Sequence, residues 1–250
     1  MSTRSSATHA MRKLVAGARW TGVVAALSLA SGWAVGQEAA PLHNNDPFES
    51  FNRGVYRFND GVDRAVLKPV ATAYRDGVPS LVRQGVGNFF GNLGDVWNLA
   101  NNVLQFKLQN SAETFMRLNV NTFFGLGGLL DIASEAGIER HSEDFGQTLG
   151  RWGVPSGPYV VLPLLGPSTV RDTAALPVDL YGDAVSHVND IPARNSLSAL
   201  HVVDKRASLL RASALLQDAA LDPYSFTRDA YLQKRRNDVD DGNTPDDGQQ

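Results

Sequence analysis

Apolar side chains recur at intervals of three and four residues along most of the chain, which is the spacing of one face of an α-helix. The first such stretch begins behind Asp46, Pro47 and Glu49, a combination typical of a helix start with Asp46 as N-cap and Glu49 completing a capping box. Lys68 and Pro69 should end it, because proline disfavours helical geometry in the preceding residue. The apolar positions of this predicted helix are Phe48, Phe51, Val55, Phe58, Val62 and Ala65.

A second face of the same predicted helix is polar and carries Asn52, Tyr56 and Asn59. This face could be solvated, with the apolar face packing a core, or it could line a polar channel. The sequence pattern leaves both interpretations open.

More helices are predicted behind similar start signals, at Ser80, Asn110, Ser168, Ser196 and the pair Asp222-Pro223. Residues 96–104 form a separate helical stretch. The helix after Ser80 contains Gly85, Gly87, Gly91 and Gly94. Each glycine costs a helix about 1 kcal/mol relative to alanine, so this density indicates close backbone packing or a bend.

Two segments are apolar yet rich in helix-breaking residues. Residues 152–167 contain four prolines and three glycines, which predicts an extended, irregular path lying against a core, a lipid or a membrane. Residues 123–130 place five large apolar residues around three glycines. Either this second segment is a buried helix end with a glycine C-cap, or it is an exposed apolar loop that contacts lipid or another protein.

Composition and charge define the domain boundaries. With 250 residues, 43% of them apolar and 20% charged, the chain suits one globular domain. Residues 1–36 carry basic residues, then an apolar run shorter than the about 20 residues that span a bilayer, then small residues, as in a secretory signal peptide. We expect a linker at 37–45, a helical domain at 46–236 and a disordered acidic tail at 237–250.

Charge and cysteine content exclude several function classes. Removal of residues 1–36 would leave 19 basic and 26 acidic residues, whereas nucleic-acid binding requires a basic surface. The chain has no cysteine, so disulfides and thiol chemistry are excluded. No pattern predicts a cofactor or a metal.

Glu139, His141, Glu143 and Asp144 form the one cluster that could bind a metal or act as a general base. A solvated turn followed by a helix cap explains the same pattern and is the favoured interpretation. No Gly-x-Ser-x-Gly elbow is present, so a lipase lacks its nucleophile.

Two motifs carry a family resemblance. DPFESFNRGVYRFNDGVDRAVLKPVATAYRDGVP at 46–79 and HSEDFGQTLGRWGVPSGPYVVLPLLGPSTVRD at 141–172 resemble the VacJ (MlaA) family, and the likeness extends over residues 46–231. The resemblance implies a mainly α fold, with amphipathic helices in a ring around an amphipathic channel. It implies non-enzymatic transport of phospholipid from the outer leaflet of the outer membrane to a periplasmic lipid carrier, beside a trimeric porin.

The resemblance also suggests site residues. The channel or gate candidates are Asn52, Tyr56, Phe58 and Asn59. The candidates for membrane or porin contact are Phe123, Phe124, Leu126, Leu129, Leu130, Tyr159, Leu162 and Leu164.

The sequence departs from the family at the lipid anchor. Family members are normally lipoproteins with an acylated cysteine, and residues 28–37 contain none. Such a member could bind the periplasmic side of the outer membrane without a lipid tail, work from the soluble side, or start elsewhere than Met1. A periplasmic lipid hydrolase and a structural porin-associated protein are the alternative functions.

Overall fold

The structure is a computed structural model that describes residues 46–242, a mainly helical unit. The predicted signal peptide, the linker and residues 243–250 lie outside the described residues. The elements are α3 (Glu49–Val62), the π-helical turn η1 (Asp63–Leu67), α4 (Lys68–Gly77), α5 (Ser80–Leu104), α6 (Leu108–Phe123), α7 (Ile132–Glu135), α8 (Phe145–Arg151), β1 (Tyr159–Leu162), β2 (Gly166–Thr169), α9 (Val170–Gly182), the 3-10 turn η2 (Ala184–His187), α10 (Ile191–Ala219) and α11 (Pro223–Val239).

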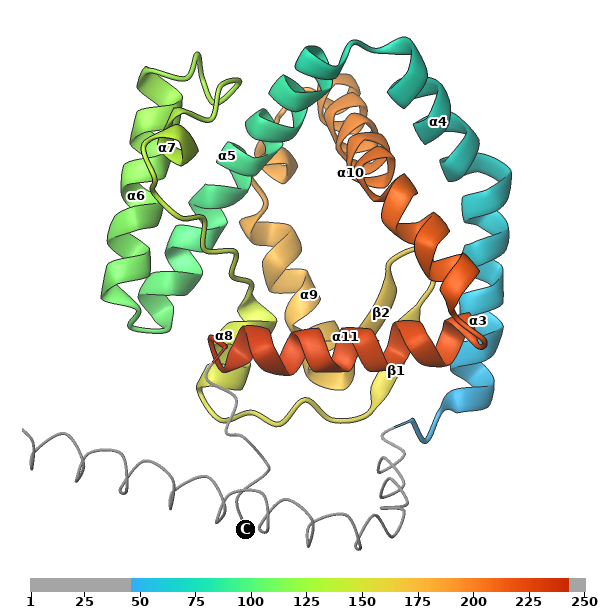
Figure 1. Ribbon diagram of the computed structural model, residues 1–250. Helices are drawn as coiled ribbons and strands as arrows, with labels where there is room; N and C mark the ends of the chain where they lie inside the picture. Colours follow the sequence, from blue (N-terminus) through green and yellow to red (C-terminus); the bar gives the residue numbers. More distant parts are fainter. Residues whose placement is uncertain (1–45, 243–250) are drawn as a thin grey trace, which may run out of the picture. The chain divides into compact units, whose positions relative to one another are not determined.

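Helices surround the middle of this unit (Figure 1). The chain runs through α3 and α4 on one side, returns through α5 on the other, and α11 closes the arrangement below. α6 packs along α5 as a helical hairpin, α10 crosses the unit and packs on α4, and α8 packs on α9. This arrangement agrees with the ring of amphipathic helices that the resemblance implied.

The predicted capping box at the start of α3 is wrong. α3 begins at Glu49, and no side chain caps it. Asp46 is buried instead, where its carboxylate accepts hydrogen bonds from Asn52 Nδ2 at 2.7 Å and from the Tyr224 hydroxyl. The aspartate therefore fixes α3 to α11, since the long-range partners have taken the oxygens that a cap would use.

The first helix does not end at Pro69, contrary to prediction. The chain stays helical from Glu49 to Gly77, and the π turn η1 lies directly before the proline. Lys68 N–H bonds to the Asp63 carbonyl, five residues back. A wider turn accommodates the missing proline N–H and the bulk of its ring, so the helix continues.

Several other helix boundaries differ from their predicted positions. α5 is one helix where two were predicted, Asn110 lies inside α6, Thr169 caps α9 in place of Ser168, and Asp190 caps α10 ahead of Ser196. The start of α11 at Asp222 and Pro223 is confirmed. This helix extends to Val239, beyond the predicted end of the folded domain at residue 236.

Close packing, one of the two interpretations of the glycines in α5, occurs at Gly91, whereas Gly85, Gly87 and Gly94 meet ordinary contacts or open space. A Cβ at Gly91 would collide with the guanidinium of Arg140. The end of an arginine side chain is flexible, so this contact favours glycine at position 91 without excluding a larger residue.

Part of the proline-rich segment forms a regular hairpin, contrary to prediction, whereas residues 152–158 follow the irregular path that was predicted. β1 and β2 pair antiparallel, with Tyr159 opposite Thr169 and Val161 opposite Pro167. A two-stranded sheet has edges where a missing N–H is tolerated, which explains how proline fits here. Tyr159 and Val161 are buried and pack with Tyr224.

The free edge of β1 is bound by asparagine side chains of α3. Asn52, which is fully buried, donates from Nδ2 to the Tyr159 carbonyl at 3.1 Å and accepts from the Val161 N–H at 2.9 Å. Asn59, two helical turns further on, binds the following residues of the chain in the same way. The side-chain amides act as a substitute for a third strand.

Removing the first of these amides should destabilise the fold strongly. Asn52→Ala leaves two backbone groups of β1 and one oxygen of Asp46 without their partner, and each buried unsatisfied group costs about 1–3 kcal/mol. We expect the free energy of unfolding, measured by urea titration in detergent, to fall by more than about 2 kcal/mol. Asn119→Ala is the control, because its amide bonds the carbonyl of Phe115 one turn earlier. Equal losses in the two variants would contradict the role of Asn52.

Candidate functional site

The interior of the described unit is polar and its surface is apolar. Seventeen polar or charged side chains are buried against ten apolar ones, while 33 large apolar side chains are exposed. Exposed apolar surface on this scale marks contact with a membrane or with another protein. Within residues 46–242, however, no helix has both the length and the apolar character needed to cross a membrane. The apolar surface is therefore distributed over helix faces and the turns between elements, of which two are described below.

The first apolar turn follows α6, and we call residues 123–130 the tip. Phe123, Phe124 and Leu126 are 70–75% exposed, and Leu129 and Leu130 are about half exposed. Of the two interpretations left open by the sequence, the exposed loop is confirmed. α6 ends at Phe123, and the chain then turns through Leu126, Gly127 and Gly128, whose φ angles of 55°, 72° and 92° are positive.

The tip rests on a buried ion pair. Arg117, 1% exposed, donates to both carboxylate oxygens of Asp131 at 2.8 and 3.0 Å. Asn121 donates to Asp131 at 2.9 Å and accepts from the Ala133 N–H. Burial alone would raise the pKa of Asp131, but hydrogen bonds from Ser134 and Asn121 and the charge of Arg117 outweigh it and lower the pKa to about 2.

The second apolar turn joins β1 to β2. Leu164 and Leu165 are 66% and 62% exposed. Asn59 holds the turn from behind, donating to the Leu162 carbonyl at 2.9 Å and accepting from the Leu164 N–H at 2.8 Å. Leu162 is half-buried, and Tyr159 is fully buried in the core. The prediction that Tyr159 contacts the membrane or a porin is wrong, because the alternation of the strand turns its side chain inward.

The channel candidates of α3 have different environments. Asn52 is fully buried against β1, so its proposed place in a channel wall is wrong. Asn59 also binds the backbone at β1 but is partly exposed, and its place in a channel stays a prediction. Phe58 is 55% exposed on the outward face. Tyr56 lines a cavity of about 660 Å³ between α3 and the start of α11.

Arginines dominate this cavity, which we call the α3–α11 pocket. Its wall is formed by Ser50, Arg53, Tyr56, Arg57, Asp60, Arg64, Asp222, Pro223 and Tyr224. This pocket was not predicted from the sequence, although positions 50, 53, 57, 60 and 64 share one face of a helix and their spacing is a signal for it.

Carboxylates orient two of the arginines. Arg53 bonds Asp222 Oδ2 at 2.7 Å and Glu49 Oε1 at 2.8 Å, and its guanidinium lies 4.3 Å from the ring centroid of Tyr224. These bonds, with one from Ser225, hold the pKa of Asp222 well below its usual range. Arg64 pairs with Asp60 at 2.8 Å.

The cluster considered for catalysis does not assemble. His141 Nε2 lies 2.6 Å from Glu113, Glu143 pairs with Lys107 at 2.8 Å, and Asp144 caps α8 through the Gln147 N–H. Across residues 46–242 no group of three or more metal-ligating side chains is placed to hold an ion. The prediction that these charged residues form a turn and a helix cap is confirmed for Asp144, which caps α8.

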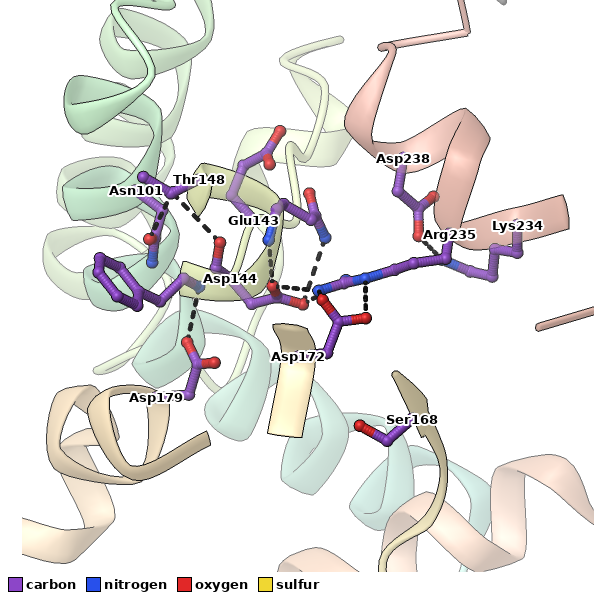
Figure 2. A network of polar contacts seen from close by, with 12 residues as sticks. Asn101, Glu143, Asp144, Thr148, Ser168, Asp172, Asp179, Lys234, Arg235 and Asp238 are labelled. Carbon is purple, nitrogen blue, oxygen red and sulfur yellow. Dashed lines mark hydrogen bonds and ion pairs between the residues drawn. The ribbon is translucent and has the colours of Figure 1, made fainter. Parts of the chain in front are cut away.

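Asp144 belongs instead to a network that joins three helices (Figure 2). Arg235 of α11 reaches between Asp144 of α8 and Asp172 of α9, at 2.6 and 2.8 Å. Burial would raise the pKa of Asp172, but its bonds to Arg235 and Arg171 lower it. On the opposite side of α8, Thr148 donates to Asn101 of α5 at 2.8 Å.

Comparison with known proteins agrees with this architecture. Residues 44–238 match the family model of the MlaA lipoprotein, which covers nearly all of the described unit. The chain belongs to the MlaA lipoprotein family.

Individual MlaA relatives are similar over most of their length. The chain is 38% identical to the intermembrane phospholipid transport system lipoprotein MlaA of Escherichia coli K12, over 76% of each chain. It is 35% identical to the protein of that name in Haemophilus influenzae, over 79% of this chain and 80% of the relative. A solved structure, described as the structural basis for maintenance of bacterial outer membrane lipid asymmetry, superimposes with a TM-score of 0.68 at 35% identity, covering 78% of this chain and 98% of that one.

The ion pair below the tip should make stability depend on pH. A folded pKa of about 2 for Asp131 lies below the unfolded value of about 3.9, so its contribution is complete above about pH 4 and is lost as the pH falls towards 2. We expect the free energy of unfolding to drop by about 2 kcal/mol over this interval on account of this carboxylate. Asp131→Asn should be less stable at pH 6 and should lack this part of the drop.

The matched control is Glu135→Gln, which removes an exposed carboxylate of α7 that lies outside the ion pair. Its unfolding curve should keep the acid transition of the wild-type protein. An Asp131→Asn variant that loses stability with acid as steeply as the wild type would contradict the assignment.

Proposed function

We propose that this chain transports phospholipid without catalysing a reaction. It removes mislocalised phospholipid from the outer leaflet of the outer membrane and passes it through a channel to a periplasmic lipid carrier. The observation that carries this proposal is the family match, which extends over the whole folded unit and includes relatives named as phospholipid transport lipoproteins. Transport of this kind maintains the lipid asymmetry of the outer membrane.

The distribution of polarity supports the proposal. Exposed apolar side chains suit acyl chains, and the charged lining of the α3–α11 pocket suits head groups, for which an apolar medium is unfavourable. A lipid that slides along such a path undergoes no covalent step, so the protein needs no nucleophile or metal.

The two alternatives are less well supported. A periplasmic lipid hydrolase would require the cluster at His141, but His141, Glu143 and Asp144 each bind a different partner. A structural protein that only contacts a trimeric porin could use the tip, but it would have no need for an arginine-lined pocket between α3 and the start of α11.

Membrane attachment by the apolar turns would explain how this member works without cysteine. The relatives are named as lipoproteins, and this sequence has no cysteine to acylate. One acyl chain gives only marginal membrane binding, so exposed apolar side chains can replace it. We propose that the tip and the turn at Leu164 and Leu165 place the protein at the periplasmic side of the outer membrane.

Charges at the tip should release the protein from the membrane. Leu126→Asp combined with Leu129→Asp places two carboxylates where we expect lipid, at a cost of at least about 2.5 kcal/mol each. Fractionation should then recover the variant in the soluble periplasm. Gln109→Asp combined with Gln233→Asp adds the same charge at exposed polar positions of α6 and α11 and should stay with the membrane. Both pairs in the same fraction would contradict the anchoring role of the tip.

Transport itself is tested by the lipid that the protein carries and moves. Cells that lack their own family member should accumulate phospholipid in the outer leaflet. Expression of this chain should lower that amount. Mass analysis of the purified protein should detect bound phospholipid. His141→Ala should reduce it equally well. Lysophospholipid produced by the wild type but not by this variant would establish hydrolysis instead, and a purified protein free of phospholipid would favour the structural alternative.

A further inference from the structure

The α3–α11 pocket contains one arginine whose charge is not matched. Arg53 and Arg64 have carboxylate partners inside the pocket, whereas Arg57 forms no ion pair or hydrogen bond through its side chain with any of residues 46–242. The lining therefore holds three guanidinium groups against the carboxylates of Asp60 and Asp222. Glu49, beside the lining, also binds Arg53, so three carboxylates lie among the three arginines, and Arg57 is the one without an ion-pair partner among residues 46–242.

Both neighbours of Arg57 along the helix are held in place. Arg53 lies one turn before it and is fixed by Glu49, by Asp222 and by the ring of Tyr224. Arg64 follows two turns later and pairs with Asp60. The pocket wall is thus ordered before a ligand enters, and Arg57 keeps its donors available, the arrangement that favours tight binding of an anion.

The shape and the surroundings of the pocket indicate which anion fits. Its volume of about 660 Å³ exceeds what a simple inorganic ion fills and lies in the range of organic ligands. The rings of Tyr56 and Tyr224 supply apolar walls. Phe51 and Phe58, 61% and 55% exposed, lie on the adjoining face of α3, about 100° around the helix from Arg57.

We propose that this pocket binds the phosphodiester head group of a phospholipid, with Arg57 donating to the phosphate oxygens and the acyl chains leaving along Phe51 and Phe58. The proposal rests on the proposed transport function and names the side chain that holds its substrate. Guanidinium is suited to this task, because its planar donors match the geometry of phosphate oxygens.

The test compares binding of dihexanoylphosphatidylcholine by the full-length protein and by Arg57→Gln, in detergent, using calorimetry. Loss of a bond between two charged groups should weaken binding about tenfold or more. Arg57→Glu should weaken it further, by repelling the phosphate. Arg211→Gln, which removes an exposed arginine of α10 outside the pocket, should bind as the wild type does.

Two further ligands identify the chemical group that is recognised. Dihexanoylglycerol, which has the same chains and no phosphate, should bind the wild-type protein and Arg57→Gln equally weakly. Inorganic phosphate should compete only poorly, because it cannot use the apolar walls. Competition by inorganic phosphate at the affinity of the lipid would show a site for free phosphate and overturn the proposal.

The outcome separates this inference from the function on which it rests. If the wild-type protein carries phospholipid from cells while Arg57→Gln binds the short-chain lipid with unchanged affinity, the head-group site is wrong and transport stands. If the wild-type protein carries no phospholipid and does not bind the short-chain lipid, both fail.

Discussion

Buried polar bonds hold these helices together, and the rest of the structure depends on them. Arg235 joins α8, α9 and α11 through Asp144 and Asp172, and Asn52 joins α3 to β1 and to Asp46. Where the outside of a protein contacts lipid, hydrophobic burial no longer drives helices together, and packing and hydrogen bonds must do so. The polar bonds of the interior stabilise the contacts between helices, so the large apolar side chains need not be buried for this purpose and can lie on the surface.

α3 shows how one helix meets both demands. Its amide face, with Asn52 and Asn59, binds the edge of β1, while its aromatic face, with Phe51 and Phe58, is exposed. A third face carries the arginines of the α3–α11 pocket. Because a helix turns about 100° per residue, three chemically different faces fit on fourteen residues without competing.

The sequence predicted what depends on local periodicity and missed what depends on distant partners. The helical spacing and the start at Asp222 and Pro223 were predictable, because proline and aspartate act on their own neighbours. The role of Asp46 was not predictable, since the Tyr224 that binds it lies 178 residues away. The polar face with Asn52 was misassigned, because water, a channel and a strand edge all select the same amide side chains.

The tip and the turn at Leu164 and Leu165 are both fixed by side chains that bind backbone groups beside them, and this accounts for the exposure of their apolar residues. Behind the tip, Asn121 and Asp131 bind backbone groups of the segment that follows, and behind the turn at Leu164, Asn59 binds the chain on both sides. Apolar residues on an unsupported loop would fold back onto the protein to escape water. Side chains that satisfy the backbone from within fix each turn in place, so its leucines and phenylalanines stay directed outward even before a membrane is present. The exposure of apolar side chains at these turns therefore depends on hydrogen bonds made in the interior of the unit.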